Sequence, residues 1–264
     1  MTLPIFTPPE DPGPSFFSLL QKVGTFQNIY EKITNSDLIT HGTTIVAIRY
    51  KGGVLMAGDR RATSGHLISH RTMEKVFPAD AFSGVGISGA AGPAMEMVRL
   101  FQLQLEHYEK VEGSPLSLEG KANQLSLMLK GNFPAAMQGL GVVPIFAGYD
   151  EKTAEGRLFQ FDITGGRYEE KDFVATGSGS LHASTVVKLR HSASVELSEA
   201  IDIALEALLE ASEEDSATGG PDLLRGIFPV VAKIDLDGFE RISDDELENR
   251  TETIVQSISQ RGNS

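Results

Sequence analysis

The chain has 264 residues, a formal net charge of −13, 41% hydrophobic residues and no cysteine. This apolar content is enough for a substantial core and excludes global disorder. The acidic balance argues against binding to nucleic acid or to anionic membranes. Disulfides, thiolate metal sites and cysteine nucleophiles are excluded outright, and the lack of cysteine fits a cytoplasmic protein.

The first 42 residues differ from those that follow. Five of the chain's 12 prolines lie within residues 1–14, which disfavours regular structure there. Residues 15–33 are mildly amphipathic and predict either a short helix lying on another surface or a floppy terminal tail. No apolar run reaches the ~18–20 residues of a membrane span, and no signal peptide is predicted.

A β-hairpin is predicted directly after this segment. Two apolar runs, Thr43–Tyr50 and Val54–Asp59, flank Lys51-Gly52-Gly53. Gly42 has no Cβ, so a neighbouring side chain can approach its carbonyl, and the Thr43 hydroxyl is the nearest candidate nucleophile. Cutting the Gly42–Thr43 bond would give Thr43 a free α-amine, which titrates near ~7.7–8.0 and can act as a base. A threonine that starts a strand is also common without such chemistry.

The remaining elements group as strands, two helices, strands, two helices and a strand. Residues 60–73 predict a loop, and residues 244–264 a frayed helix with a polar tail. Strands are expected at 82–89, 142–149, 157–162, 167–173 and 226–236, and helices at 94–112, 118–129, 181–190 and 198–214. This grouping favours two packed antiparallel sheets covered by helices over alternating βαβ units.

Two patterns suggest other functions, and both are weak. Gly84–Gly89 matches the dinucleotide fingerprint, which would make the chain an oxidoreductase, but the nearest candidate for the required acidic residue, Glu106, falls inside a predicted helix. These glycines are better interpreted as letting the backbone lie flat against a bound chain. His66 and His70 are four residues apart, but no third metal ligand is evident, so neither a metal nor any cofactor is expected.

Five motifs in register carry a resemblance to a known family. They are Gly42-Thr43, Gly58-Asp59-Arg60-Arg61-Ala62-Thr63, Glu74-Lys75-Val76-Phe77, Gly177-Ser178-Gly179-Ser180 and Asp215-Ser216-Ala217-Thr218-Gly219-Gly220. In this order and at these separations the chain resembles, over about residues 41–237, the β subunits of bacterial, actinobacterial-type 20S proteasomes, which are N-terminal-nucleophile hydrolases. The resemblance implies an α+β fold, a four-layer αββα sandwich. It also implies a propeptide, 1–42, removed on maturation, and a single catalytic domain, 43–264.

The resemblance also implies roles for three residues of a threonine endopeptidase. Thr43 would be nucleophile and, through its α-amine, base. Lys75 would favour the alkoxide and lower the pKa of the amine by like charge. Asp59 would hold Lys75 by ion pairing. Taken alone, a lysine in a polar loop is usually solvated, and an aspartate at a strand end is usually a turn or cap residue.

Four further residues complete the site that the resemblance implies. Gly89 would offer its N–H to the developing oxyanion. Ser178 and Asp215 would position the amine and water, although Ser178 also fits a helix N-cap. Thr218 stands where the family often has serine, and because the hydroxyl is retained we expect the role to be retained.

Substrate is expected to lie as an extended strand against Thr63 and Gly89. By resemblance, the pocket for the residue before the cut would be formed by Ala62, Met73, Ile87, Ala91 and Met95. No charge lines this set, so an apolar residue is expected there.

The resemblance implies a large assembly. The partners would be proteasome α subunits and other β subunits in stacked seven-membered rings (α7β7β7α7), with an ATPase regulatory ring reached through the α rings and unfolded proteins as substrates. The alternative is a non-catalytic structural subunit of the same barrel. Such subunits lack the threonine, aspartate or lysine, whereas Thr43, Asp59 and Lys75 all stand in place here.

Overall fold

The predicted hairpin lies inside one of the two five-stranded sheets of the structure. The structure is a computed structural model that describes residues 42–262, so the amphipathic stretch 15–33 lies outside the described residues. Strand β1 (Thr44–Tyr50) pairs antiparallel with β2 (Gly53–Gly58), and Tyr50 lies opposite Gly53 at the turn. The hairpin prediction is therefore confirmed.

Two five-stranded antiparallel sheets carry the fold. The first has the order β10-β1-β2-β11-β12 and includes β10 (Phe173–Gly177), β11 (Val230–Asp235) and β12 (Gly238–Arg241). The second has the order β5-β6-β7-β8-β9, with β5 (Val76–Asp80), β6 (Ser83–Gly89), β7 (Val142–Asp150), β8 (Glu155–Phe161) and β9 (Arg167–Glu170). All pairings within both sheets are antiparallel.

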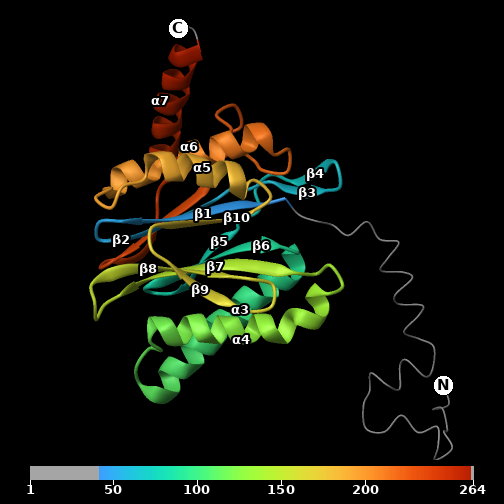
Figure 1. The fold of residues 1–264 in the computed structure, drawn as a ribbon, viewed down its shortest axis with the longest axis vertical. Coiled ribbons are helices and arrows are strands. Elements are labelled where there is room, and N and C mark those ends of the chain that lie inside the picture. Colours follow the sequence, from blue (N-terminus) through green and yellow to red (C-terminus); the bar gives the residue numbers. More distant parts are fainter. Residues whose placement is uncertain (1–41, 263–264) are drawn as a thin grey trace, which may run out of the picture. The chain divides into compact units, whose positions relative to one another are not determined.

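Helices cover the outer face of each sheet. The helices are α3 (Ala91–Glu112), α4 (Leu118–Ala136), α5 (Ser180–Arg190), α6 (Leu197–Glu214) and α7 (Asp244–Gly262). Figure 1 shows α5 and α6 over the first sheet and α3 and α4 under the second. The predicted four-layer αββα sandwich is confirmed. Within residues 42–262, no helix combines the length and apolarity needed to cross a bilayer.

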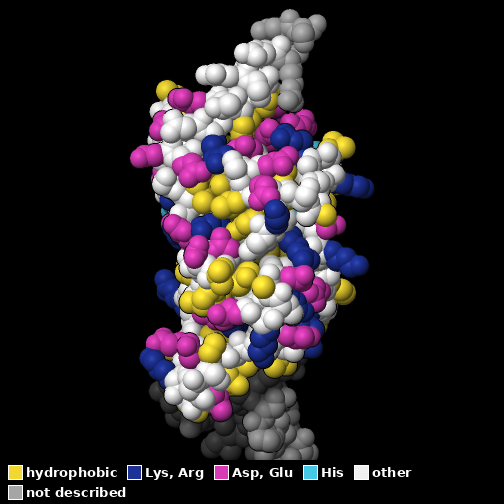
Figure 2. Space-filling view, turned by 90° about the vertical axis from the view of Figure 1, so that its left-hand side faces the viewer, with side chains coloured by type: hydrophobic (Ala, Val, Ile, Leu, Met, Phe, Trp, Pro, Cys, Tyr) yellow, Lys and Arg dark blue, Asp and Glu magenta, His cyan; other side chains and the backbone are white. Residues whose placement is uncertain are grey.

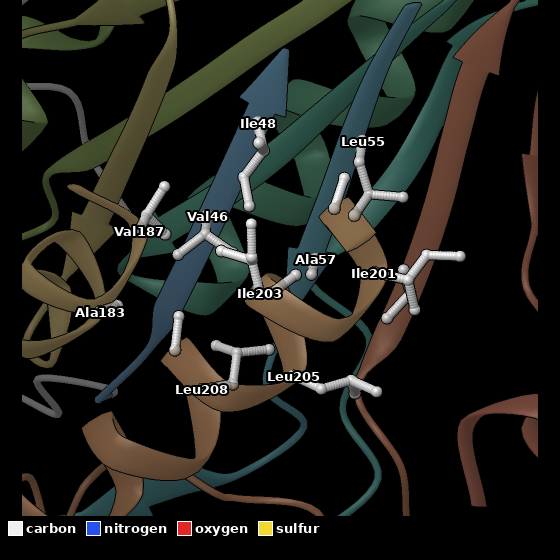
Figure 3. Packing of buried hydrophobic residues seen from close by; sticks show 14 of the residues in the cluster. Val46, Ile48, Leu55, Ala57, Ala183, Val187, Ile201, Ile203, Leu205 and Leu208 are labelled. Carbon is white, nitrogen blue, oxygen red and sulfur yellow. The ribbon is translucent and has the colours of Figure 1, made fainter. Parts of the chain in front are cut away.

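Three hydrophobic cores separate the four layers, because the central strands are buried on both faces. Along β1, Val46 and Ile48 point into the core under α5 and α6, whereas Ile45 and Ala47 point into the core between the sheets. Successive side chains of a strand alternate between faces, so a strand buried on both sides reads as a continuous apolar run. Figure 3 shows side chains of α6 packed over β1 and β2.

The glycines of the 84–89 motif let the two sheets approach each other. A Cβ atom on Gly86 would lie 2.8 Å from Ile45 Cγ2, and one on Gly84 would lie 3.0 Å from the sulfur of Met56. Both neighbours belong to the first sheet. The expectation that these two glycines lie against a bound chain is therefore wrong: they lie against the other sheet of the same chain.

Two further predictions are corrected by the structure. Residues 60–73 contain a small hairpin, β3 (Ala62–Ser64) with β4 (Leu67–His70), and all four residues of β4 are exposed. The α4 helix continues past Gly131 and Pro134 to the buried Ala136, well beyond the predicted end at residue 129. Burial of one helix face can outweigh the low propensity of these two residues.

The last third of the chain differs from prediction in three places. The expected strand 167–173 is two strands, because β9 pairs with β8 in the second sheet and β10 pairs with β1 in the first. Strand β12 was not predicted. The C-terminal segment is a helix up to residue 262, with acidic residues in its first turn and Leu247 and Ile254 buried. Contacts with other elements of the fold determine the split into β9 and β10, the strand β12 and the length of α7, and the local sequence pattern does not contain these contacts.

The close approach of the sheets can be tested by adding one methyl group. Gly86→Ala is expected to lower the free energy of unfolding by about 1–3 kcal/mol, because the new Cβ overpacks the core against Ile45. The matched control is Gly131→Ala, where a Cβ meets no atom within 4 Å. Because alanine has the higher helix propensity, this substitution should raise the free energy of unfolding by up to about 1 kcal/mol. Urea unfolding measures both. Equal effects of the two substitutions would contradict this account of the packing.

Candidate active site

The ends of four segments meet at one place. Thr43 directly precedes β1, Asp59 follows β2, Lys75 precedes β5 and Ser178 follows β10. The first sheet fixes three of them, because Thr44 lies opposite Gly177 and Ile45 opposite Gly58. The antiparallel register therefore brings residues far apart in the chain to one edge of the sandwich.

Asp59 and Lys75 form a buried ion pair. The Lys75 Nζ lies 2.7 Å from Asp59 Oδ1, and the exposed fractions of the two side chains are 2% and 0%. Thr44 N–H also donates to Asp59 Oδ1, at 2.8 Å. The N–H groups of Arg61 and Gly219 donate to Asp59 Oδ2, each at 2.9 Å. A buried pair needs such additional hydrogen bonds to offset the cost of desolvation.

All three protons of the Lys75 ammonium are used. Besides Asp59, the Nζ donates to the carbonyl of Arg61 at 2.5 Å and to that of Gly42 at 3.1 Å. Burial lowers the pKa of Lys75, and the neighbouring Asp59 carboxylate counteracts part of that effect. The ammonium is thus held in one orientation and directed at the carbonyl before Thr43.

The Gly42 carbonyl oxygen accepts from two groups at once. The Thr43 hydroxyl donates to it at 2.8 Å, and the Lys75 ammonium contacts the same oxygen. Thr43 is only 3% exposed. The Gly42 N–H donates to the Thr63 hydroxyl at 3.3 Å, so Thr63, a predicted substrate contact, touches the residue that precedes Thr43. A hydroxyl that adds to this carbonyl would place negative charge beside the ammonium, where electrostatic stabilisation is strongest.

Ser178 lies on the other side of Thr43. The Thr43 N–H donates to Ser178 Oγ at 3.3 Å, and that hydroxyl donates to Asp215 Oδ2. A Cβ on Gly177 would lie 1.8 Å from the Thr43 carbonyl oxygen, so only glycine permits this approach. The alternative of Ser178 as an N-cap is wrong, because Gly179 is the N-cap of α5 and no side chain caps that helix.

Asp215 and Thr218 belong to one hydrogen-bond chain. The Gly179 N–H donates to the Thr44 hydroxyl at 3.1 Å, which pairs with the Thr218 hydroxyl at 2.6 Å, which in turn donates to Asp215 Oδ2 at 2.6 Å. Burial tends to raise the pKa of Asp215, but the hydrogen bonds from Ser178 and Thr218 outweigh it, and the pKa is lowered. Asp215 is therefore an ionised acceptor at neutral pH.

Three residues form hydrogen bonds with the predicted site residues, and the sequence analysis gave none of the three a role. Thr44 supplies an N–H to Asp59 and a hydroxyl to Thr218. Arg61 supplies an N–H and a carbonyl, and Gly219 supplies an N–H. Arg61 and Gly219 lie within two of the motifs without an assigned role, and Thr44 directly follows the first motif, so position in or beside a motif was the only signal. Since most of their contributions come from the backbone, side-chain chemistry did not indicate them.

The remaining predicted residues lie on the second sheet and its connections. The Ile87 N–H donates to the Lys75 carbonyl at 2.9 Å, which ties β6 to the ion pair, and Gly89 ends the same strand. Ile87 and Met95 pack in one hydrophobic cluster. Ala62 is buried, and Met73 and Ala91 are half-buried. The structure thus brings Ile87 and Met95 together, and Gly89 lies two residues beyond Ile87.

Comparison with known proteins agrees with this geometry. The proteasome subunit family matches residues 39–222, more than two thirds of the chain. The "Proteasome subunit beta" of Acidimicrobium ferrooxidans is 54% identical over 264 residues, covering 99% of this chain and 96% of that protein. The "Proteasome subunit beta" of Streptomyces griseus is 54% identical over 221 residues, covering 84% of this chain and 77% of that protein. The chain therefore belongs to the proteasome subunit family, as a β subunit of the threonine-type endopeptidases.

Proposed function

We propose that this chain cuts its own Gly42–Thr43 bond and then works as the catalytic β subunit of a 20S proteasome core. The supporting observation is that the Thr43 hydroxyl and the Lys75 ammonium both contact the Gly42 carbonyl oxygen, with Asp59 behind the ammonium. A lone threonine hydroxyl is a poor nucleophile and needs such help.

The cut begins when Thr43 Oγ adds to the Gly42 carbonyl carbon. The resulting oxyanion lies beside the Lys75 ammonium. The C–N bond then breaks, the Thr43 nitrogen takes up the proton that the hydroxyl has lost, and an ester links Gly42 to Thr43 Oγ. Water hydrolyses that ester, which releases residues 1–42 with a terminal carboxylate and leaves Thr43 with a free amine and hydroxyl.

In the mature chain the same groups act on a substrate peptide. The α-amine of Thr43 accepts the hydroxyl proton, and Ser178 and Asp215 position that amine. Gly89 offers its N–H to the oxyanion. The substrate residue before the cut takes the place that Gly42 occupies in the intact chain, next to Thr63.

Assembly with α subunits and further β subunits in stacked rings fits the surface of the chain. Large apolar side chains are exposed at Leu67, Leu189 and Leu224, with exposed fractions of 75%, 80% and 88%. Figure 2 shows apolar groups among the charged side chains on one face. Contacts with other subunits would remove these apolar side chains from water, which is favourable. We propose that the rings cover it, and that an ATPase ring delivers unfolded proteins through the α rings.

Lys75 provides a sharp test of the mechanism. Lys75→Ala should slow both release of residues 1–42 and peptide hydrolysis by at least ~100-fold, because the ammonium acts in a site with little water. Lys75→Arg should fail nearly as badly, since a planar guanidinium cannot replace a compact ammonium. Each variant is assembled with α subunits, and subunit mass and peptide turnover are then measured.

The control for Lys75 is the other buried lysine of the described part. Lys121 pairs with Asp80 at 2.5 Å, and its side chain is 7% exposed. Lys121→Met should lower stability, yet its folded fraction should release residues 1–42 at the wild-type rate. Normal maturation and turnover of Lys75→Ala would show that Lys75 is not catalytic.

Substitutions of Thr43 distinguish a catalytic β subunit from a purely structural one. The active subunit should begin at Thr43, and Thr43→Ala should keep residues 1–42 and show no peptidase activity. Thr43→Ser keeps the hydroxyl and should still mature. Intact mass and N-terminal sequencing measure both outcomes. Fully active particles that begin at Met1 would contradict the proposal.

The specificity of the site follows from its uncharged pocket. Fluorogenic peptides with a large apolar residue before the cut should be hydrolysed faster than those with arginine or glutamate, because Ile87 and Met95 present no charge to pair with. The ratio of kcat/KM values is the measurement. A clear preference for arginine would show that the pocket residues are wrongly assigned.

A further inference from the structure

One buried hydrogen bond joins side chains of the two sheets. Ser88 belongs to β6 and Thr176 to β10, and their hydroxyl oxygens are 3.1 Å apart. The two residues are 5% and 6% exposed. The Ser88 hydroxyl also donates to the Val143 carbonyl at 2.7 Å. Since a hydroxyl carries one proton, the Thr176 hydroxyl is the donor to Ser88.

The rest of the space between the sheets is filled by apolar side chains such as Ile45, Met56 and Val174. Within residues 42–262, no other buried hydrogen bond joins side chains of strands from different sheets. Apolar packing has no direction, whereas a hydrogen bond works only over a narrow range of distance and angle. The Ser88–Thr176 bond therefore sets the separation of β6 and β10 more sharply than the core does.

Both hydroxyls lie one residue before a glycine of the active site. Gly89 follows Ser88, and Gly177 follows Thr176. A Cβ on Gly177 would lie 1.8 Å from the Thr43 carbonyl oxygen, so the end of β10 touches the nucleophilic residue. The bond thus connects the strand end that holds Thr43 to the strand end that carries Gly89.

The N–H of Gly89 points to the edge of β6 where Lys75 lies. The Ile87 N–H donates to the Lys75 carbonyl at 2.9 Å, whereas the Ala90 N–H donates on the opposite side, to the Gly141 carbonyl at 2.8 Å. N–H groups alternate between the two edges of a strand. The N–H of Gly89 therefore shares the direction of the Ile87 N–H, toward the ammonium.

The end of β6 extends beyond its neighbour on that edge. Strand β5 begins at Val76, which lies opposite Gly86, so Ser88 and Gly89 have no β5 residue beside them. On the other edge, Gly89 lies opposite Val142 of β7. The overhang leaves the N–H of Gly89 free for a ligand, but it also removes the strand that would hold Gly89 in place.

We propose that the Ser88–Thr176 hydrogen bond positions the oxyanion donor: it holds Gly89, on the second sheet, at a fixed distance from Thr43, which the first sheet holds. The inference rests on the proposed catalytic roles of Thr43 and Gly89. An oxyanion donor must lie about 2.7–3.1 Å from the oxyanion, and a misplacement of about 1 Å can cost ~100-fold in rate. Ser88 and Thr176 act through Gly89 and are positioning residues.

Two substitutions of Thr176 separate its hydroxyl from its shape. Thr176→Val keeps the branched shape and removes the hydroxyl, whereas Thr176→Ser keeps the hydroxyl and removes a methyl group. In matured particles, Thr176→Val should lower kcat for a fluorogenic peptide about fivefold with KM unchanged, because the donor acts on the transition state. Thr176→Ser should lose much less. Wild-type kcat in Thr176→Val, or an equal loss in Thr176→Ser, would overturn the proposal.

A double variant separates positioning from stability. Ser88→Ala leaves the Thr176 hydroxyl buried without its acceptor and should lower Tm. Adding Thr176→Val removes both hydroxyls, so Tm should recover most of that loss. The kcat of the double variant should stay as low as that of Thr176→Val, because the bond between the sheets is still missing. Recovery of kcat together with Tm would show that the pair acts only through stability and would overturn the proposal.

Hydrogen exchange tests the same restraint without catalysis. In the uncleavable Thr43→Ala chain, exchange of the amides of residues 86–90, followed by mass spectrometry, should be faster with Thr176→Val than with Thr176→Ser. Residues 145–147, inside β7, should exchange equally in both. Equal exchange of residues 86–90 would overturn this inference even if Thr43 is the nucleophile. Peptidase activity of the Thr43→Ala chain would instead contradict the proposed function, so the two failures are distinguishable.

Discussion

The Lys75–Asp59 ion pair is the interaction on which the site depends. Both side chains are buried, so neither can be solvated, and each must find its partners within the fold. Asp59 accepts from three different backbone N–H groups, and Lys75 donates to two carbonyls. This network joins the hairpin, the segment after β2 and the loop before Gly219. The cost of two buried charges is offset only when all of these segments are in place.

Close packing of the two sheets makes this network possible. The Ile87 N–H donates to the Lys75 carbonyl, so the position of Lys75 depends on the second sheet, whereas Asp59 directly follows β2 of the first sheet. Gly84 and Gly86 allow the sheets to approach, and the three cores fix their separation. Helix α6 packs against the first sheet, and Asp215 is its C-cap residue. The packing that stabilises the fold therefore also sets the distances within the site.

Arg61 and Gly219 connect the Lys75–Asp59 pair to the segments beside it. Arg61 uses its backbone for Asp59 and Lys75 and its guanidinium for the Ser216 carbonyl.

The sequence by itself determined the hairpin, the helix pairs and the residue types that meet at the site. Two apolar runs and the turn residues between them predicted β1 and β2, and the motifs named Thr43, Asp59 and Lys75. Local patterns did not reveal the crossing from β9 to β10, β12 or the hairpin at 62–70, because pairing between distant segments decides these features. They also missed the backbone donors of Arg61 and Gly219, since every residue type carries the same N–H group. Only the tertiary structure decided which N–H groups face Asp59.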